Sequence, residues 1–355
     1  MLQVGDEWLC SAAVFLLTLC ATRSAAAASL LTAALYVFPV MFRFPAVPAE
    51  RAARVLRPGG GPAGGDVPVV ARRAGGHDAP ENTLAAIREV RDQSRNGATG
   101  VELDLSFTAD GVAVLLHDDT VDRTTNGSGP ISSLRLAYVK SLDASARHRL
   151  KYGGLLNSLF GYIYSGIKDG ERFGVQTVPT LQEAVQECIK HSLTVFLNVK
   201  CYPDKAASAL ADMYKRFPVL YNSSIVCSFE PKVIYKMRQA DPHVVTALTH
   251  RPWSLSRHSD GTPRALSSWA QFWSEVLDVL LDWAHHHLLW DLCGVSAILI
   301  HKDFISLDYV QYWAERGVEV VGWAVNTVVE KQYYQDLLKI GYITDSLLED
   351  CDPQY

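Results

Sequence analysis

The sequence predicts an α/β protein that folds as a TIM (β/α)8 barrel, with an apolar membrane anchor before it and an amphipathic helical insertion within it. Beyond residue 66, short apolar runs alternate with segments of helical periodicity, as β/α repeats do. About eight such runs occur over roughly 280 residues, which matches the strand number and size of a (β/α)8 barrel. Polar residues follow several of these runs, at the strand ends where such barrels place active sites.

The expected strands cover residues 67–71, 100–106, 112–117, 194–199, 225–228, 244–248, 297–300 and 318–325. The expected helices cover residues 83–91, 180–191, 205–217, 231–239 and 306–316. We therefore divide the chain into an anchor (1–43), a linker (44–66) whose second half is rich in Gly and Pro, and a barrel (67–355). Two segments exceed a minimal barrel: a Gly- and Tyr-rich insertion at 151–176 and a Trp-rich segment at 268–292.

Composition excludes several classes of protein. Hydrophobic residues make up 48% of the 355 residues, which is too many for a disordered chain. The net charge of −5, with no cluster of Lys and Arg, argues against binding to nucleic acid. The seven cysteines form no C-x-x-C or Cys/His metal spacing, so the chain is not a disulfide scaffold.

The apolar segment from residue 8 to residue 42 predicts a membrane anchor. Arg23 is its only ionised side chain, and it divides the segment into two apolar runs. Roughly 20 apolar residues cross the hydrocarbon core of a bilayer. A retained anchor is favoured over a cleaved signal peptide, which would need a basic start, and over a buried helix.

The orientation of this anchor stays open. Four arginines, at positions 43, 51, 54 and 57, follow the anchor and by the positive-inside rule favour a cytoplasmic barrel. Asn126 and Asn222 begin N-glycosylation motifs, which are used only in a lumenal or extracellular barrel. We expect a barrel held at the plasma membrane or an internal membrane, on the lumenal or extracellular side.

The segment 268–292 combines four tryptophans with acidic residues. Glu275, Asp278 and Asp282 make a membrane-spanning helix costly. The pattern favours an amphipathic helix that lies at a membrane surface or covers an apolar substrate. An ordinary helix packed on the barrel is the alternative, and the adjacent histidines at 285–287 point to different helix faces, which argues against a metal site there.

The residues that carry chemistry lie at the ends of consecutive expected strands. Glu102 and Asp104 occupy one face of a strand, because side chains alternate with a period of two. Two converging carboxylates suit a hard divalent cation such as Mg²⁺ or Ca²⁺. His117 offers an imidazole for proton transfer, and Arg73 and Lys200 would neutralise a phosphate. Each feature alone is weak, but together they predict a phosphate-directed active site.

Several motifs resemble the glycerophosphodiester phosphodiesterase family. They are GHDAPENT (76–83), GVELD (100–104), LHD (116–118), DRTT (122–125) with Gly127, and VPTL (178–181). The segments THRPWS (249–254) and YITDS (342–346) resemble membrane-anchored members of that family. The resemblance implies a TIM barrel that hydrolyses glycerophosphodiesters, such as glycerophosphoinositol or glycerophospho-N-acylethanolamine, to glycerol 3-phosphate and an alcohol.

The resemblance also implies roles for individual residues. It implies a divalent cation, Mg²⁺ ahead of Ca²⁺, and a membrane lipid environment as a partner. The implied roles are metal ligands at Glu102 and Asp104, one of two catalytic imidazoles at His117, phosphate binding at Arg73, charge neutralisation at Lys200, and the glycerol side at Trp323 and Asn326.

Two positions depart from the family's pattern. The first catalytic imidazole of the family precedes the arginine at the place of Arg73, and this chain has Arg72 there. An arginine stays protonated, so Arg72 cannot act as a general base. Asn198 stands where the family places an acidic third ligand, so it keeps an oxygen but loses a charge. We therefore expect weaker cation binding and strongly reduced activity.

Two alternatives stay open beside family activity. The first is a catalytically impaired barrel that binds phosphodiesters or a protein partner at the membrane. The second is another lipid phosphodiesterase, of the phosphatidylinositol phospholipase C or sphingomyelinase D kind. The motifs at 80–83 and 122–125 argue against the second alternative.

Overall fold

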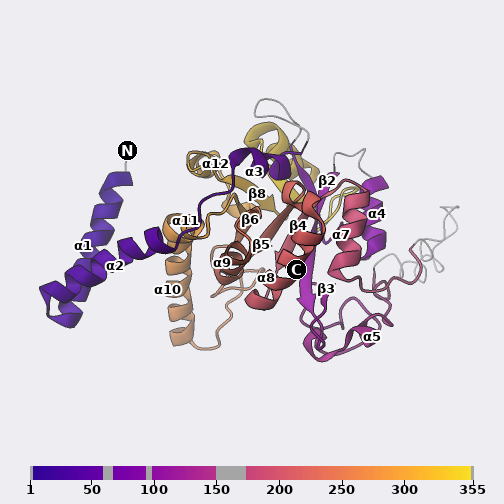
Figure 1. Ribbon diagram of the computed structural model, residues 1–355, viewed down its shortest axis with the longest axis horizontal. Helices are drawn as coiled ribbons and strands as arrows, with labels where there is room; N and C mark the ends of the chain where they lie inside the picture. The colour runs from indigo at the N-terminus through magenta and orange to yellow at the C-terminus, as the bar shows by residue number, and fades with distance from the viewer. Residues whose placement is uncertain (1–2, 59–66, 93–97, 149–172, 353–355) are drawn as a thin grey trace.

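The structure is a computed structural model that describes residues 3–58, 67–92, 98–148 and 173–352 (Figure 1). Most of the segment 151–176 that the sequence predicts as an insertion lies outside these described residues, as does most of the Gly- and Pro-rich loop before residue 67. Eight parallel strands form a closed barrel in the order β1-β9-β8-β7-β6-β5-β4-β2, and β2 pairs with β1 to close it. The predicted TIM barrel is therefore confirmed.

The barrel strands are short and almost wholly buried. They are β1 (Val69–Arg72), β2 (Ala98–Phe107), β4 (Thr194–Val199), β5 (Ser224–Ser228), β6 (Thr246–His250), β7 (Ala297–His301), β8 (Glu319–Trp323) and β9 (Gly341–Thr344). Parallel strands covered on both faces read as continuous apolar runs, which is why the sequence marks them clearly.

The main helices lie outside the strands (Figure 1). They are α4 (Leu84–Asp92), α7 (Leu181–Lys190), α8 (Pro203–Arg216), α9 (Pro231–Ala240), α10 (Ser268–Ala284), α11 (Trp290–Cys293), α12 (Leu307–Ala314) and α13 (Val328–Gln332). Shorter helical turns are α5 (Leu136–Val139), η2 (Ile131–Ser133), η4 (Pro218–Asn222), η5 (His285–Leu289), η6 (Lys302–Phe304) and η7 (Tyr333–Leu338).

Local sequence signals explain where several helices begin. Thr180 and Thr327 each form a capping box with the glutamate three residues later, which satisfies free N–H groups at the helix start. Pro203 and Pro231 occupy the first position of α8 and α9, where a missing N–H costs nothing. Helices α8, α9 and α13 follow the parallel strands β4, β5 and β8, whose carboxyl ends meet at one edge of the barrel.

One predicted strand is wrong in its role. The segment 112–117 contains β3 (Ala113–Leu115), which pairs antiparallel with β2 outside the barrel instead of forming a barrel strand. The turn at Asp110-Gly111, with Gly111 at φ +79°, returns the chain directly as a hairpin. The eighth barrel strand is β9, which the sequence analysis did not place among the strands.

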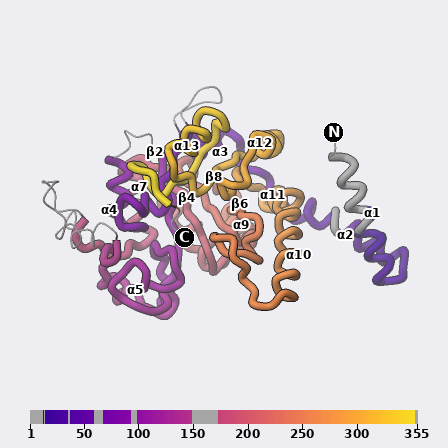
Figure 2. Tube along the Cα trace, turned by 180° about the vertical axis from the view of Figure 1, so that it is seen from behind, coloured from indigo at the N-terminus to yellow at the C-terminus, as the bar shows by residue number. Residues whose placement is uncertain are grey.

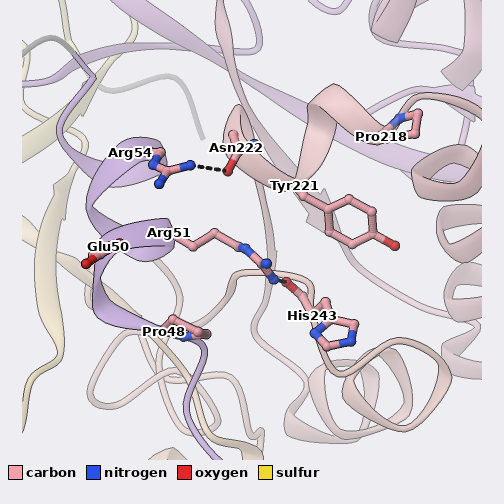
Figure 3. Close-up of a pocket in the computed structure, with 8 residues that line it drawn as sticks. All are labelled: Pro48, Glu50, Arg51, Arg54, Pro218, Tyr221, Asn222 and His243. Carbon is pink, nitrogen blue, oxygen red and sulfur yellow. Dashed lines mark hydrogen bonds between the residues drawn. The ribbon is translucent and has the colours of Figure 1, made fainter.

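The segment predicted as a linker holds a helix that packs against the barrel. Helix α3 (Ala49–Leu56) buries Val55 and Leu56 against side chains inside the barrel, including Phe196. Figure 3 shows how α3 is tied to the barrel, with Arg54 reaching Asn222 and Arg51 donating to the carbonyl of His243. Helix α3 thus closes the end of the barrel at which the strands begin.

The predicted anchor forms two helices, α1 (Gln3–Thr22) and α2 (Ala25–Phe42), joined at Arg23. The pair projects from one side of the barrel (Figures 1 and 2). Among the described residues, α2 is the one helix that is long and apolar enough to cross a membrane, and almost none of it is buried. Arg23 has a φ of +53°, so it forms the turn of a hairpin instead of interrupting one long helix.

Close strand packing at Gly100 provides a test of the fold. A Cβ atom at this position would lie 2.5 Å from the carbonyl oxygen of Thr194 on β4. We expect Gly100→Ala to lower the free energy of unfolding by about 2–3 kcal/mol, because the overpacked strands must separate. Gly111→Ala is the matched control, because its Cβ meets nothing within 4 Å. It should cost about 1 kcal/mol through its positive φ alone. Equal losses for both variants in chemical denaturation would contradict this account.

Candidate active site

A cavity of about 410 Å³ opens at the carboxyl ends of the barrel strands. Seven residues singled out from the sequence line it: Arg72, Glu102, Asp104, His117, Asn198, Lys200 and Trp323. A larger hollow of about 510 Å³ lies at the opposite end, between α3 and η4 (Figure 3). That hollow contains one carboxylate, Glu50, and no carboxylate pair, so the candidate chemistry belongs to the smaller cavity.

Two buried carboxylates form the centre of the cavity. Glu102 and Asp104 lie on one face of β2, as the alternation predicts, and Asp104 is level with Asn198 on β4. Burial, reinforced by the charge of Asp104, raises the pKa of Glu102 to about 7. Burial also opposes ionisation of Asp104, but the charges of Lys200 and other nearby cations outweigh it and hold that pKa well below its usual range.

The residues around Asp104 hold it in place. Asn82 exchanges two hydrogen bonds with it, because its Nδ2 donates to Oδ2 at 3.0 Å and its Oδ1 accepts from the Asp104 amide at 3.1 Å. Asn198 Nδ2 donates to Oδ1 at 3.1 Å, and Lys200 Nζ lies 3.6 Å from the same oxygen. Asn82, which the sequence analysis assigned no role, is thus a positioning residue at a φ of +56°.

The donor atoms present fit a hard divalent cation. Asn198 Oδ1 is buried and has no hydrogen-bond partner among the described residues. A buried acceptor without a partner requires an explanation, and a cation beside the two carboxylates supplies one. No group of three or more His, Cys, Asp or Glu side chains that could hold a metal occurs in the described part of the chain. The protein therefore offers two carboxylates and one amide oxygen, and the remaining ligands would be water or substrate.

His117 follows β3 and faces these carboxylates across the cavity. Its Nδ1 bonds Asp118 Oδ1 at 2.7 Å, so Nε2 is the nitrogen left for proton transfer. Burial lowers the pKa of His117 below its usual value, although the hydrogen bond to Asp118 opposes the shift. The imidazole is therefore mainly neutral at pH 7. Lys200 Nζ donates to the carbonyl oxygen of His117, which joins the two sides of the cavity.

Arg72 projects into the cavity from the end of β1. Its guanidinium pairs with Asp345 at 3.1 Å, and Asn326 Nδ2 donates to the other oxygen of Asp345 at 2.8 Å. Burial disfavours the charged form of Arg72, but Asp345 and then Glu102 outweigh it and raise the pKa above its usual value. Arg72 is therefore a fixed positive charge in the cavity wall, and it cannot accept a proton.

Arg73, for which the resemblance implies phosphate binding, lies next to Asp104. Its side chain is buried, pairs with Glu81 at 3.2 Å and lies 3.7 Å from Asp104, and it is not among the residues that line the cavity. Its Nη2 has no hydrogen-bond partner among the described residues. The structure thus puts Arg72 at the cavity wall and Arg73 behind the carboxylates.

Other imidazoles do not take the place of a second one in the cavity. His77 bonds Glu349 at 2.8 Å, and His250 at the end of β6 bonds Asp282 at 2.9 Å. His301 at the end of β7 packs edge-on against Trp323, with ring centroids 5.1 Å apart. Of the described residues that line the cavity, His117 carries the one imidazole.

The structure adds Thr249, to which the sequence analysis gave no role, beside Trp323, which it selected. Thr249 Oγ1 and Trp323 Nε1 are buried in the cavity wall and have no hydrogen-bond partner among the described residues, so both can bind a polar ligand. Asn326 supports Asp345 and does not line the cavity. The remaining wall comes largely from the segment after β6, through Arg251, Ser254, Ser259 and Arg264. The motif at 249–254 marked part of this segment but gave no role to its residues.

Comparison with known proteins agrees with this geometry. The glycerophosphoryl diester phosphodiesterase family matches residues 73–349. The chain is 50% identical over 342 residues to glycerophosphodiester phosphodiesterase 1 of Mus musculus, covering 96% of this chain and 95% of that protein. The Homo sapiens protein of the same name is 48% identical with the same coverage.

Solved structures show the same fold at low sequence identity. A phosphodiesterase from Oleispira antarctica, in complex with the product sn-glycerol-3-phosphate, aligns with a TM-score of 0.55 at 22% identity, covering 79% of this chain and 93% of that one. A structure from Silicibacter pomeroyi aligns with a TM-score of 0.60 at 18% identity, covering 84% and 95%.

An ion network beside His117 generates a prediction about acid stability. Arg123 bridges Glu81 and Asp118, with distances of 2.7 and 2.6 Å. Burial opposes ionisation of both carboxyls, but bonds to Arg123, and for Asp118 also to His117, lower both pKa values. Carboxyls with lowered pKa values stabilise the fold above their unfolded pKa of about 4, and this contribution is lost as the pH falls.

We therefore expect Arg123→Gln to lower the free energy of unfolding at pH 7 by about 1–2 kcal/mol. This is less than for a fully buried pair, because 40% of the Arg123 side chain is exposed. The difference from the unmodified protein should shrink as the pH falls below about 4, where the carboxyls protonate in the unfolded chain while those of the folded protein are still largely ionised. Denaturation curves at pH 7, 5 and 3.5 would measure it. A difference that stays constant across this range would refute the assignment.

Proposed function

Because the chain belongs to the glycerophosphoryl diester phosphodiesterase family, we propose that its cavity cleaves glycerophosphodiesters to glycerol 3-phosphate and an alcohol with a divalent cation, at a rate reduced by the missing second imidazole. The observation that carries this proposal is the meeting of the carboxylate pair, Asn198 Oδ1 and His117 in one cavity with two fixed cations. Glycerophosphoinositol and glycerophospho-N-acylethanolamine are the substrates that we would test first.

Glu102, Asp104 and Asn198 would hold the cation, and Mg²⁺ is favoured over Ca²⁺. When bound, the ion polarises the phosphate and offsets the negative charge that grows on it during displacement. Lys200 and Arg72 face the same space and add fixed positive charge to the phosphate oxygens. Thr249 Oγ1 and Trp323 Nε1 are free to bind the glycerol hydroxyls.

His117 would carry the proton transfer. Its neutral Nε2 accepts the proton of the attacking glycerol hydroxyl, and the new O–P bond displaces the alcohol from phosphorus. Among the described residues that line the cavity, His117 carries the one imidazole, so the leaving alkoxide takes a proton from water, and the hydroxide formed takes back the proton held by His117. Water opens the resulting cyclic phosphate to glycerol 3-phosphate. Proton transfer from a positioned group is worth about 10²–10⁴-fold in rate, so the loss of one such group should be visible in kcat.

A second role, binding without turnover, is favoured by one observation. Arg72 lies at the place of the missing imidazole and is paired to Asp345, so the cavity presents a fixed cation to an anionic ligand. A cavity of this kind can retain a phosphodiester or its product without cleaving it. The experiment that follows separates this role from catalysis.

The test is release of glycerol 3-phosphate from glycerophosphoinositol by detergent-solubilised full-length protein. We expect slow turnover that EDTA abolishes and Mg²⁺ restores, no turnover in His117→Ala, and a gain of about 10²-fold or more in Arg72→His. Asn198→Asp should lower the Mg²⁺ concentration needed for half-maximal activity, because it restores a charged ligand.

Two results would decide against parts of the proposal. Turnover only in Arg72→His would exclude catalysis by the unmodified chain and leave binding as its role. Kinetics within about tenfold of the Arg72→His/Asn198→Asp double variant would contradict impairment, because one lost proton transfer should cost more.

We further propose that α2 anchors the barrel on the lumenal or extracellular side of a membrane. Arg43, Arg54 and Arg57 bind Asp291, Asn222 and Glu319 of the barrel, so these basic residues have a structural explanation apart from membrane orientation. Both predicted glycosylation acceptors are exposed, at Asn126 and Asn222.

Expression in a eukaryotic cell tests this orientation. We expect peptide-N-glycosidase F to increase the gel mobility of the unmodified protein, and an Asn126→Gln/Asn222→Gln variant to lack that shift. An unchanged mobility, together with digestion of the barrel by protease added to the cytoplasmic side of sealed microsomes, would instead place the barrel in the cytoplasm.

A further inference from the structure

Helix α10 has its polar and apolar faces reversed relative to an ordinary barrel helix. A helix turns by 100° per residue, which places Gln271, Glu275, Asp278 and Asp282 on one face. A helix on the outside of a barrel normally buries apolar side chains and exposes polar ones. In α10 the polar face contacts the protein, and the apolar face points away from it.

The three acidic residues of the polar face each bond a group of the loop or strand beside α10. Asp278 accepts hydrogen bonds from the amides of Leu255 and Ser256 at 2.9 and 2.8 Å. Asp282 bonds His250 at 2.9 Å, and Glu275 pairs with Arg257 at 3.0 Å. Because these acidic groups are satisfied within the protein, they do not oppose contact between the other face and an apolar medium.

The opposite face is large, apolar and exposed. Its principal residues are Trp269, Phe272, Trp273, Leu277, Leu280 and Trp283. Their exposed fractions run from 40% for Trp283 to 70% for Trp269, and no charged side chain lies among them. A continuous apolar patch of this kind on a protein surface marks an interaction site.

We propose that this face of α10 lies in the surface of the same lipid bilayer that α2 enters. The proposal rests on the membrane anchor proposed above, and the connection between the two helices supports it. The Phe44 amide, two residues after α2, donates to Leu292 O at 3.0 Å, and Arg43 pairs with Asp291 at 3.4 Å. Helix α11, which carries both partners, follows α10 through the short turn η5.

The end of α2 is thus fixed to the segment that continues α10. Figures 1 and 2 show α10 running along the side of the barrel from which α2 projects. An apolar face rich in tryptophan suits the boundary between headgroups and acyl chains, where amphipathic helices lie about 5–10 Å deep. A bilayer entered by α2 therefore reaches the apolar face of α10 without a further partner.

This arrangement connects the membrane to the cavity. The residues of the cavity wall that follow β6 belong to the same segment that the polar face of α10 binds. The Arg264 amide donates to Ser256 O at 2.8 Å, next to the amides held by Asp278. The membrane-facing helix and one wall of the cavity form a single bonded unit, which holds that wall next to the bilayer surface.

The test uses tryptophan fluorescence of the full chain reconstituted in phosphatidylcholine vesicles, compared with vesicles whose acyl chains carry bromine. The signal of the three helix tryptophans is the difference between the unmodified protein and Trp269→Phe/Trp273→Phe/Trp283→Phe, which keeps the face apolar. We expect brominated lipid to quench this difference signal by roughly half or more, because the helix lies within about 10 Å of the headgroup boundary. Trp323→Phe is the control, and the signal of Trp323, inside the barrel, should be the same in both lipids.

Equal brightness of the three tryptophans in both lipids would overturn the proposal. If crosslinking in the vesicles then gave a dimer, a second copy of this chain would be the occupant of the face. Vesicle flotation of the same sample reports on α2 separately, and the readout does not depend on catalysis. Failure of the docking surface is therefore distinguishable from failure of the anchor and of the proposed activity.

Discussion

The candidate active site depends on two carboxylates buried side by side inside the barrel. An unpaired buried charge is costly, and two carboxylates of like charge raise that cost. Neighbouring groups offset part of this cost, because the amide of Arg73 donates to Glu102 and the ammonium group of Lys200 lies beside Asp104. Burial, reinforced by the charge of Asp104, still raises the pKa of Glu102, so these contacts offset only part of the cost.

The same constraint gives Arg72 a place beside the carboxylates. Its charge lies near Glu102 and Asp104, and Asp345 holds it in position. Asp345 is in turn held by Asn326, so the late strands position the residue at the end of β1. Arg72 cannot accept a proton, but its charge stabilises the buried carboxylates.

Much of the fold could be predicted from the sequence, because parallel strands buried on both faces form distinct apolar runs. Periodicity does not report how a strand pairs, so it cannot tell that the strand at 112–117 lies outside the barrel. The Asp110-Gly111 turn is the sequence signal for the antiparallel hairpin that this strand forms. The carboxylate pair was predictable from alternation along one strand. The place of Arg73 beside Asp104 was not, because alternation along a strand does not report the left-handed backbone, with a φ of +51°, that follows β1 at Arg73.

The orientation of α10 could not be read from its periodicity, which shows two faces but not which of them meets the protein. The contacts that fix this orientation come from the loop after β6. The amides of Leu255 and Ser256 and the side chain of Arg257 bond acidic residues of α10. Burying the apolar face instead would turn the carboxylates to solvent and take away the acceptors of those amides, at a cost of about 1–3 kcal/mol for each donor that stays buried. The loop that forms one cavity wall therefore dictates which face of α10 is turned outward.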